Sequence, residues 1–143
     1  MVYQSVSGLV PLGTKPKSNL PLDFGNGSHQ AMKRLDSITP NQYQALRELR
    51  RRLFDEFDIE AVILYGSVAR GEADEESDLD LLIVTAQPLT RPARHEITDM
   101  VFEVNLLYDT NFSTLVVDRN SWEAGVFSVL PLREEILKDG IKL

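Results

Sequence analysis

The sequence predicts a small α/β (α+β) domain with helices packed against a mixed sheet of three to four strands. The first observation is that short apolar runs of strand length alternate with longer segments of helical periodicity. The second is size, because 143 residues are typical of one domain. The third is composition, because 43% of the chain is hydrophobic, which is enough to build a core. The order of the main elements is helix, strand, strand, helix, strand, helix.

The first 31 residues differ in composition from the rest of the chain. They hold four of the eight glycines and three of the seven prolines but a single acid, Asp23, and they show no helical or strand periodicity. We therefore expect residues 1–31 to be a disordered or non-native N-terminal arm. Residues 32–143 are expected to form the folded domain, and Met32 offers an alternative start of translation.

The first element of that domain is a helix over residues 40–57. Pro40 fits its first turn, and Thr39 is suited to cap it. Its apolar side recurs at helical spacing at Leu46, Leu49, Leu53 and Phe57. A basic cluster on the same helix has two open interpretations, a solvated face or a contact with a partner or a phosphate. The cluster consists of Arg47, Arg50, Arg51 and Arg52.

Two strands follow this helix. The apolar run IEAVILY predicts a strand over residues 59–65, which ends at Gly66-Ser67. The run DLDLLIVT predicts a second strand over residues 78–85. Between them, VARGEA (68–73) is long enough for one helical turn.

The C-terminal half continues the same alternation. A helix over residues 92–108 is expected to pack through Ile97, Met100, Val101, Val104, Leu107 and Tyr108. FSTLVV (112–117) predicts a third strand, and Asn120 or Ser121 is expected to cap a short helix that contains Trp122. Pro131 opens a last helix, which Gly140 is placed to end.

Two aspartates, Asp78 and Asp80, lie at the start of the otherwise apolar second strand. Residues two apart in a strand point to one face, so the side chains of Asp78 and Asp80 project together. Like charges at the edge of a core destabilise each other, and a divalent cation offsets that repulsion. Mg²⁺ prefers carboxylate and phosphate oxygens, so the pair is a candidate metal site. The alternative is a pair of exposed carboxylates at a strand end.

The Gly-Ser pair after the first strand suits an anion. Glycine lets the backbone approach a ligand closely, and N–H groups at the start of a helical turn attract phosphate. Ser67 adds a hydroxyl donor next to Gly66, and Arg70 lies one helical turn further on. Arg70 is either a third anion contact or an ordinary surface arginine. Together, this turn and the paired aspartates suit a nucleoside triphosphate with Mg²⁺.

The stretch YGSVARGEADEESDLDLLI (65–83) resembles the signature of the DNA polymerase β-like nucleotidyltransferase superfamily, Gly-Ser followed ten residues later by Asp-x-Asp. The short chain and the Arg-Gly after the Gly-Ser are similar to the minimal nucleotidyltransferases, many of which are antitoxins paired with HEPN-type ribonuclease toxins. The resemblance implies catalytic and metal-binding roles for Asp78 and Asp80, and nucleotide binding by Gly66 and Ser67, with Arg70 as a further candidate.

What the resemblance implies chemically is transfer of a nucleoside monophosphate from a nucleotide, usually ATP, with two Mg²⁺ ions when nucleotide is bound. In the antitoxin branch the acceptor is a tyrosine hydroxyl of the toxin, so the implied partners are a nucleotide and a HEPN-type toxin, in a hetero-oligomer or homo-oligomer. Catalytic relatives also carry a third carboxylate on the next strand. The in-phase positions here, Asn111 and Ser113, are not acids. Asp109, just before that strand, is the best remaining candidate for the catalytic role, and Asp118 is a poorer one.

Composition limits the other classes of function. The net charge of −7 argues against direct binding of nucleic acid. Cysteine is absent, which excludes disulfides and fits a cytoplasmic protein. No apolar run approaches the length of about 18 residues that suggests a membrane span, and the N-terminus lacks the pattern of a secretory signal.

Three functions therefore stay open. The first is an enzyme that modifies a partner protein as a toxin–antitoxin antidote. The second is a catalytically weak or inactive protein of the same fold that neutralises a toxin by binding alone. The third, an enzyme acting on a small molecule, is placed last because the chain has no room for a separate substrate-binding domain.

Overall fold

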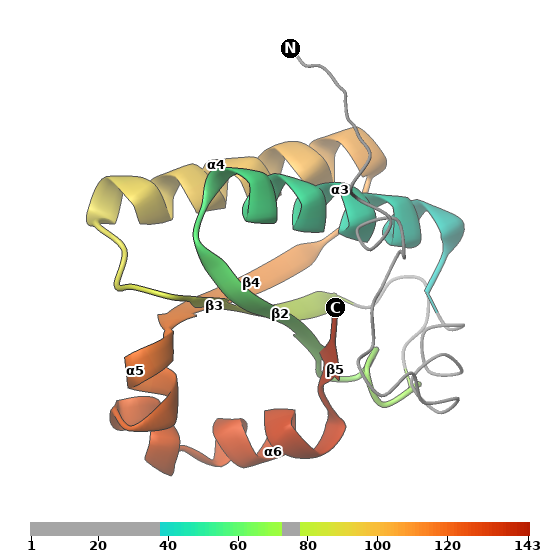
Figure 1. The fold of residues 1–143 in the computed structure, drawn as a ribbon. Coiled ribbons are helices and arrows are strands. Elements are labelled where there is room, and N and C mark those ends of the chain that lie inside the picture. The colour runs from blue at the N-terminus through green and yellow to red at the C-terminus, as the bar shows by residue number, and fades with distance from the viewer. Residues whose placement is uncertain (1–37, 73–77) are drawn as a thin grey trace, which may run out of the picture.

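The computed structural model describes residues 38–72 and 78–143, which form one sheet between two layers of helix (Figure 1). The helices α3 (Pro40–Glu56) and α4 (Arg91–Tyr108) cover one face of the sheet. The helices α5 (Arg119–Glu123) and α6 (Pro131–Asp139), joined by the 3-10 turn η1 (Val126–Val129), lie against the other. The predicted fold class is thus confirmed, whereas the arm predicted over residues 1–31 lies outside the described residues.

The sheet has four strands in the order β4-β3-β2-β5. Strand β2 (Ile59–Tyr65) pairs antiparallel with β3 (Leu79–Thr85) and with the short β5 (Ile141–Lys142). Strand β4 (Phe112–Asp118) pairs parallel with β3, and helix α4 forms the crossover connection between these two strands. The sequence predicted β2, β3 and β4 within about a residue, but it did not predict β5, because two residues carry no periodicity.

Local chemistry explains where the first helix begins. The side chain of Thr39 accepts a hydrogen bond from the backbone N–H of Gln42, and the side chain of Gln42 accepts one from the N–H of Thr39. This reciprocal capping box satisfies two of the donors that a helix start leaves free. Pro40 follows in the first turn, where its missing N–H is not needed. The predicted start at residue 40 is therefore confirmed.

Two expectations for the C-terminal half were wrong. Leu107 is 68% exposed, because Tyr108 occupies the inward side of the last turn of α4. The cap of α5 is Asp118, and neither Asn120 nor Ser121 fills that position. Asp118 accepts hydrogen bonds from the N–H and the hydroxyl of Ser121, at 3.1 and 2.8 Å. Gly140 does end α6, as expected.

The sheet divides the apolar core in two. Leu79, Leu81 and Ile83 of β3 pack toward α3 and α4. The alternate residues Leu82 and Val84 pack toward Trp122 and Ile136, on the side of α5 and α6. Each helix layer therefore buries one face of the central strand β3, so both faces of this strand are covered. Within the described residues no helix combines the length and the apolar character that a membrane crossing requires.

Candidate functional site

The start of β3 places two carboxylates on one face of the sheet. Asp78 is exposed just before the strand, and Asp80 is half-buried as its second residue. Since Leu79 points into the core under α3 and α4, strand alternation directs both aspartates to the opposite face. The side-by-side arrangement expected from Asp-x-Asp spacing thus follows from the observed strand.

Gly66 lies directly against Asp80. Tyr65, the last residue of β2, is paired with Asp80 across the antiparallel ladder. Gly66 then has a φ of +81°, and a Cβ atom built on it would lie 2.4 Å from Oδ2 of Asp80. Only glycine combines this backbone conformation with such a close approach. The Gly-Ser turn and the aspartate pair, separated in the sequence, are therefore neighbours in the fold.

The segment after Gly66 is a hydrogen-bonded turn and not a regular helix. The N–H of Arg70 donates to the carbonyl of Gly66 at 3.2 Å, and the N–H of Glu72 donates to the carbonyl of Ser67 at 2.9 Å. Val68 and Ala69, which belong to this turn, are buried in the core and anchor the turn there. This anchoring fixes the position of Ser67, which is half-buried at the start of the turn.

The electrostatics of the site favour a bound cation. Burial raises the pKa of Asp80, the negative charge of Asp78 raises it further, and the charge of Arg70 opposes both. Arg70 is also in an ion pair with Glu72, at 3.1 Å. Burial, followed by the charges of Asp80 and Glu135, raises the pKa of the Tyr65 hydroxyl. Two carboxylates that repel each other beside a tight glycine turn match the hard oxygen ligands that Mg²⁺ prefers.

The next strand brings no third acid to this pair. The parallel register sets Asp80 beside Ser113 and Leu79 beside Phe112, so Asn111 lies next to Asp78. Asp109 is the left-handed C-cap of α4, with a φ of +54°. Across residues 38–72 and 78–143, no three acidic, histidine or cysteine side chains group closely enough to hold a metal ion. The structure therefore gathers Gly66, Asp78 and Asp80 but leaves Asp109 outside such a group.

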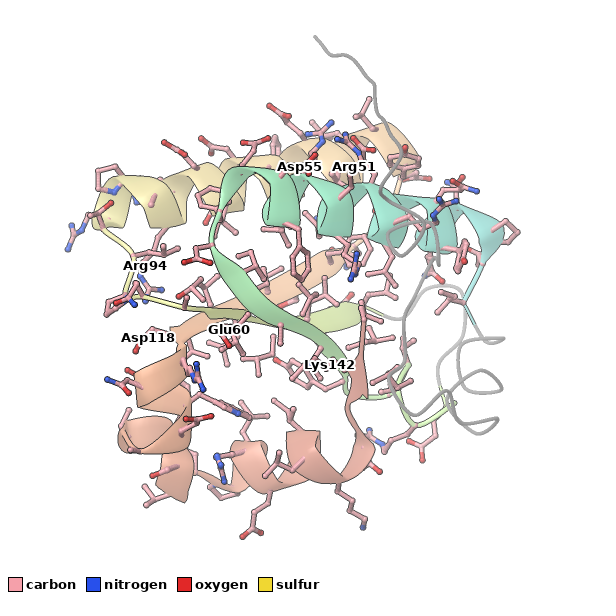
Figure 2. All side chains as sticks on the ribbon, in the orientation of Figure 1. Arg51, Asp55, Glu60, Arg94, Asp118 and Lys142 are labelled. Atoms are coloured by element: carbon pink, nitrogen blue, oxygen red, sulfur yellow. The ribbon has the colours of Figure 1, made fainter. Side chains whose placement is uncertain are left out.

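Asp118 belongs to the far end of β4. It pairs with Thr85, five residues beyond the pair of Asp80 and Ser113, which is about 16 Å at 3.3 Å per residue. Figure 2 shows Asp118 where β4 passes into α5. The hydrogen bonds from Ser121 lower the pKa of its carboxyl. Asp118 thus caps helix α5 at the end of β4 remote from the aspartate pair.

One contact at the site was not foreseen from the sequence. The side-chain Nδ2 of Asn111 donates a hydrogen bond to Oδ1 of Asp78. Asn111 stands in phase with the expected third carboxylate, and the sequence alone shows only that its side chain is not an acid. The available signal in the sequence was an amide side chain at a position expected to face the two aspartates, since an amide N–H can orient a carboxylate.

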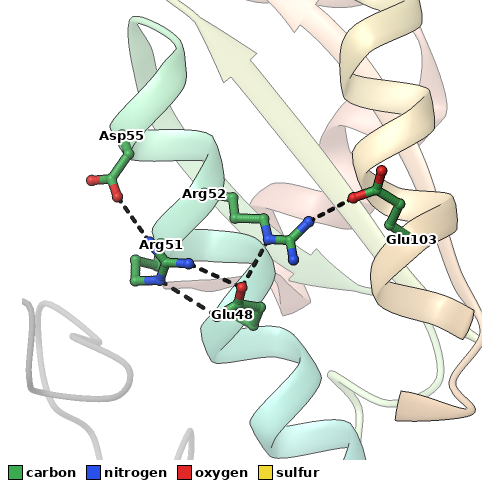
Figure 3. Close-up of polar contacts among 5 residues, drawn as sticks. All are labelled: Glu48, Arg51, Arg52, Asp55 and Glu103. Carbon is green, nitrogen blue, oxygen red and sulfur yellow. Dashed lines mark hydrogen bonds and ion pairs between the residues drawn. The ribbon is translucent and has the colours of Figure 1, made fainter. Parts of the chain in front are cut away.

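Two of the four arginines in the basic cluster of α3, Arg51 and Arg52, are in ion pairs with acidic side chains. Arg51 contacts Glu48 at 2.9 Å and Asp55 at 3.1 Å, while Arg52 contacts Glu48 at 2.8 Å and Glu103 of α4 at 3.0 Å (Figure 3). The Arg52–Glu103 pair links the two helices of that layer. The paired residues belong to α3 and α4. These two helices cover the face of the sheet into which Leu79 packs, opposite the face of the two aspartates. They favour the interpretation of a solvated, ion-paired surface over a phosphate contact at the site.

Comparison with known families agrees with this arrangement. The family model described as "Nucleotidyltransferase domain" matches residues 46–142. That range contains the glycine turn, both aspartates and all of the sheet.

Similar proteins are found in Methanocaldococcus jannaschii. Three of them are named as candidate protein adenylyltransferases, and two show the extent of the match. One is 38% identical over 58 residues, covering 41% of this chain and 59% of that relative. The other is 41% identical over 63 residues, covering 43% of each. The match thus spans about half the length of these relatives.

Solved structures give weaker likenesses. A toxin–antitoxin crystal structure with AMP-PNP has a TM-score of 0.48 and 18% identity, covering 73% of this chain and 72% of that one. A candidate nucleotidyltransferase of Sulfolobus solfataricus has a TM-score of 0.45 and 20% identity, covering 84% of this chain and 90% of that one. Both TM-scores lie below 0.5, so neither likeness supports a statement about the ligand or partner of this chain.

Proposed function

We propose, since this chain belongs to the nucleotidyltransferase domain family, that it moves a nucleoside monophosphate from a nucleoside triphosphate, with ATP the expected donor, to a hydroxyl of a partner protein. The observation that carries the proposal is the contact of Gly66 with the carboxylate of Asp80. It joins a turn suited to phosphate and a carboxylate pair suited to Mg²⁺.

The roles of the residues follow from their chemistry. Asp78 and Asp80 would hold Mg²⁺, which when bound offsets the charge of the triphosphate and polarises the transferred phosphoryl group. The backbone at Gly66 and the hydroxyl of Ser67 would donate hydrogen bonds to phosphate oxygens, and Arg70 would add a positive charge beside them.

The bond changes of the transfer are simple. The acceptor oxygen forms a bond to the α-phosphorus, the bond from that phosphorus to the bridging oxygen breaks, and pyrophosphate leaves with the electron pair. The acceptor proton passes to a carboxylate or to water. The chain's own contribution is to position the reactants and to stabilise charge.

A protein acceptor is supported by the two adenylyltransferase relatives and by the resemblance to antitoxins that the sequence signature carries. The partner we propose is a HEPN-type toxin, modified on a tyrosine hydroxyl in a complex of the two proteins. The described residues form one small domain, so such a partner would supply the acceptor and much of the surface around it.

The test is transfer of label from α-labelled ATP to a HEPN-type ribonuclease from the same genome, with Mg²⁺ or Mn²⁺. Asp78→Asn should abolish the transfer while the circular dichroism spectrum is retained. Asp109→Asn is measured beside it, because asparagine also adopts the left-handed conformation and leaves the cap intact. Loss of transfer in Asp109→Asn would assign the third carboxylate to Asp109. If no nucleoside triphosphate gives label transfer, the proposed nucleotidyltransferase activity is refuted.

A second candidate is neutralisation by binding alone. The observation that favours it is that no three-carboxylate group forms within the described part of the chain. Asp78→Asn separates the two candidates, because a protein that acts only by binding still neutralises the ribonuclease with this substitution, whereas an enzyme does not.

A further inference from the structure

The start of β4 is held in place by one side chain of α4. Asn105 accepts the N–H of Phe112 at 2.8 Å through Oδ1 and donates to the carbonyl of Phe112 at 3.3 Å through Nδ2. Oδ1 of Asn105 also accepts a hydrogen bond from the Thr110 hydroxyl at 3.1 Å. The backbone carbonyl of Asn105 accepts one from the N–H of Thr110 at 3.0 Å. The residues on both sides of Asn111 are therefore fixed to a helix.

Asn111 is in turn tied to β3 twice. Its carbonyl accepts the N–H of Leu79 at 3.0 Å, which continues the parallel ladder by one residue. Its side-chain Nδ2 donates to Oδ1 of Asp78. Because the backbone of Asn111 is anchored on two sides, the amide reaches Asp78 from a rigid position.

The chemistry of this contact differs from that of a third acid. A carboxylate at position 111 would repel Asp78, whereas the amide N–H donates a hydrogen bond to its carboxylate without adding charge. The bond engages Oδ1 and leaves the charge of Asp78 available to a cation. Hydrogen bonds of this kind to metal-binding carboxylates set their orientation, and their loss typically lowers metal affinity about 10- to 100-fold.

We propose that Asn111 is a positioning residue for the divalent cation of this site, orienting the carboxylate of Asp78 from the strand position where a third carboxylate was expected. The inference rests on the proposed function for the metal, and it adds that two carboxylates and an orienting amide form the protein part of the site.

The test is Mn²⁺ binding measured by electron paramagnetic resonance, with and without a non-hydrolysable ATP analogue. Asn111→Ala should weaken Asp78-dependent Mn²⁺ binding by about tenfold or more. The matched control is Thr114→Ala, which removes a polar side chain of β4 at the position paired with the core-facing Leu81. Thr114→Ala should leave Mn²⁺ affinity unchanged, even where the two variants lose similar thermal stability.

A kinetic measurement separates positioning from a structural role. With Asn111→Ala the apparent KM for Mg²⁺ should rise while kcat at saturating Mg²⁺ is largely kept. Simple loss of folded protein would lower kcat and leave that KM unchanged, and this result would overturn the inference, as would Mn²⁺ affinity within twofold of the wild type.

The two proposals fail in different ways. If the wild type binds Mn²⁺ through Asp78 but transfers no label, the proposed function fails and the Asn111→Ala affinity still decides the inference. If the wild type binds no Mn²⁺ in either condition, the metal premise shared by both is refuted.

Discussion

Replacing Gly66 by alanine perturbs the site in two separable ways. The backbone at Gly66 has a φ of +81°, a conformation that costs an L-residue about 1–2 kcal/mol. The new Cβ would also lie 2.4 Å from Oδ2 of Asp80, where ordinary contact begins at 3.4 Å. Since that oxygen is the end of a side chain, it can move, and the required shift is about 1 Å.

The magnitudes then divide between stability and function. Alanine lowers the entropy of the unfolded chain, which returns roughly 0.5 kcal/mol, so the net loss of stability is about 1 kcal/mol. In a folded domain of roughly 110 residues that is a fall in Tm of about 4 °C. The displacement of Asp80 acts on chemistry instead, because a misplacement of 1 Å can lower a rate by about a hundredfold.

Gly71→Ala is the matched control. Gly71 belongs to the same turn, has a φ of +75° and is exposed. We expect both variants to lose similar thermal stability, measured by circular dichroism, but only Gly66→Ala to lose Mn²⁺ affinity and label transfer, by tenfold or more. Equal effects of the two variants on Mn²⁺ binding would refute the assignment of Gly66 to the carboxylate site.

Two further predictions concern β4. Ser113→Asp sets a carboxylate beside Asp80 in the parallel register. It should raise Mn²⁺ affinity about tenfold and lower the metal-free Tm by like-charge repulsion. Unchanged Mn²⁺ affinity in a calorimetric titration would show that Ser113 does not face the aspartate pair. Asp118→Asn keeps the cap of α5 but removes its charge. Because hydrogen bonds from Ser121 lower the pKa of Asp118 below its ordinary value of 3.8, the ionised form stabilises the fold above that value and the effect is lost as pH falls through the lowered pKa. The wild type should thus exceed Asp118→Asn in urea midpoint at neutral pH and lose that advantage in acid, and a difference independent of pH would contradict this account.

Much of the fold could be read from local pattern. The leucines of α3 and the apolar run of β2 predicted those elements closely, because burial of one helix face or one strand imposes a period on the sequence. The cap of α5 was misassigned since Asp118, Asn120 and Ser121 are all chemically able to cap, and only the path of the chain after β4 selects one of them. Strand β5 was missed because two residues depend on a neighbouring strand for their pairing.

The sequence by itself determined the pair of Asp78 and Asp80, since strand alternation is a local property and residues two apart share a face. It also determined that a glycine and a serine follow the preceding strand. Only the tertiary structure decided that Gly66 touches Asp80, that the parallel register pairs Ser113 with Asp80, and that Asn111 bonds to Asp78. Contacts between strands depend on register, and register is set by the packing of both faces of the whole sheet, which no single strand encodes.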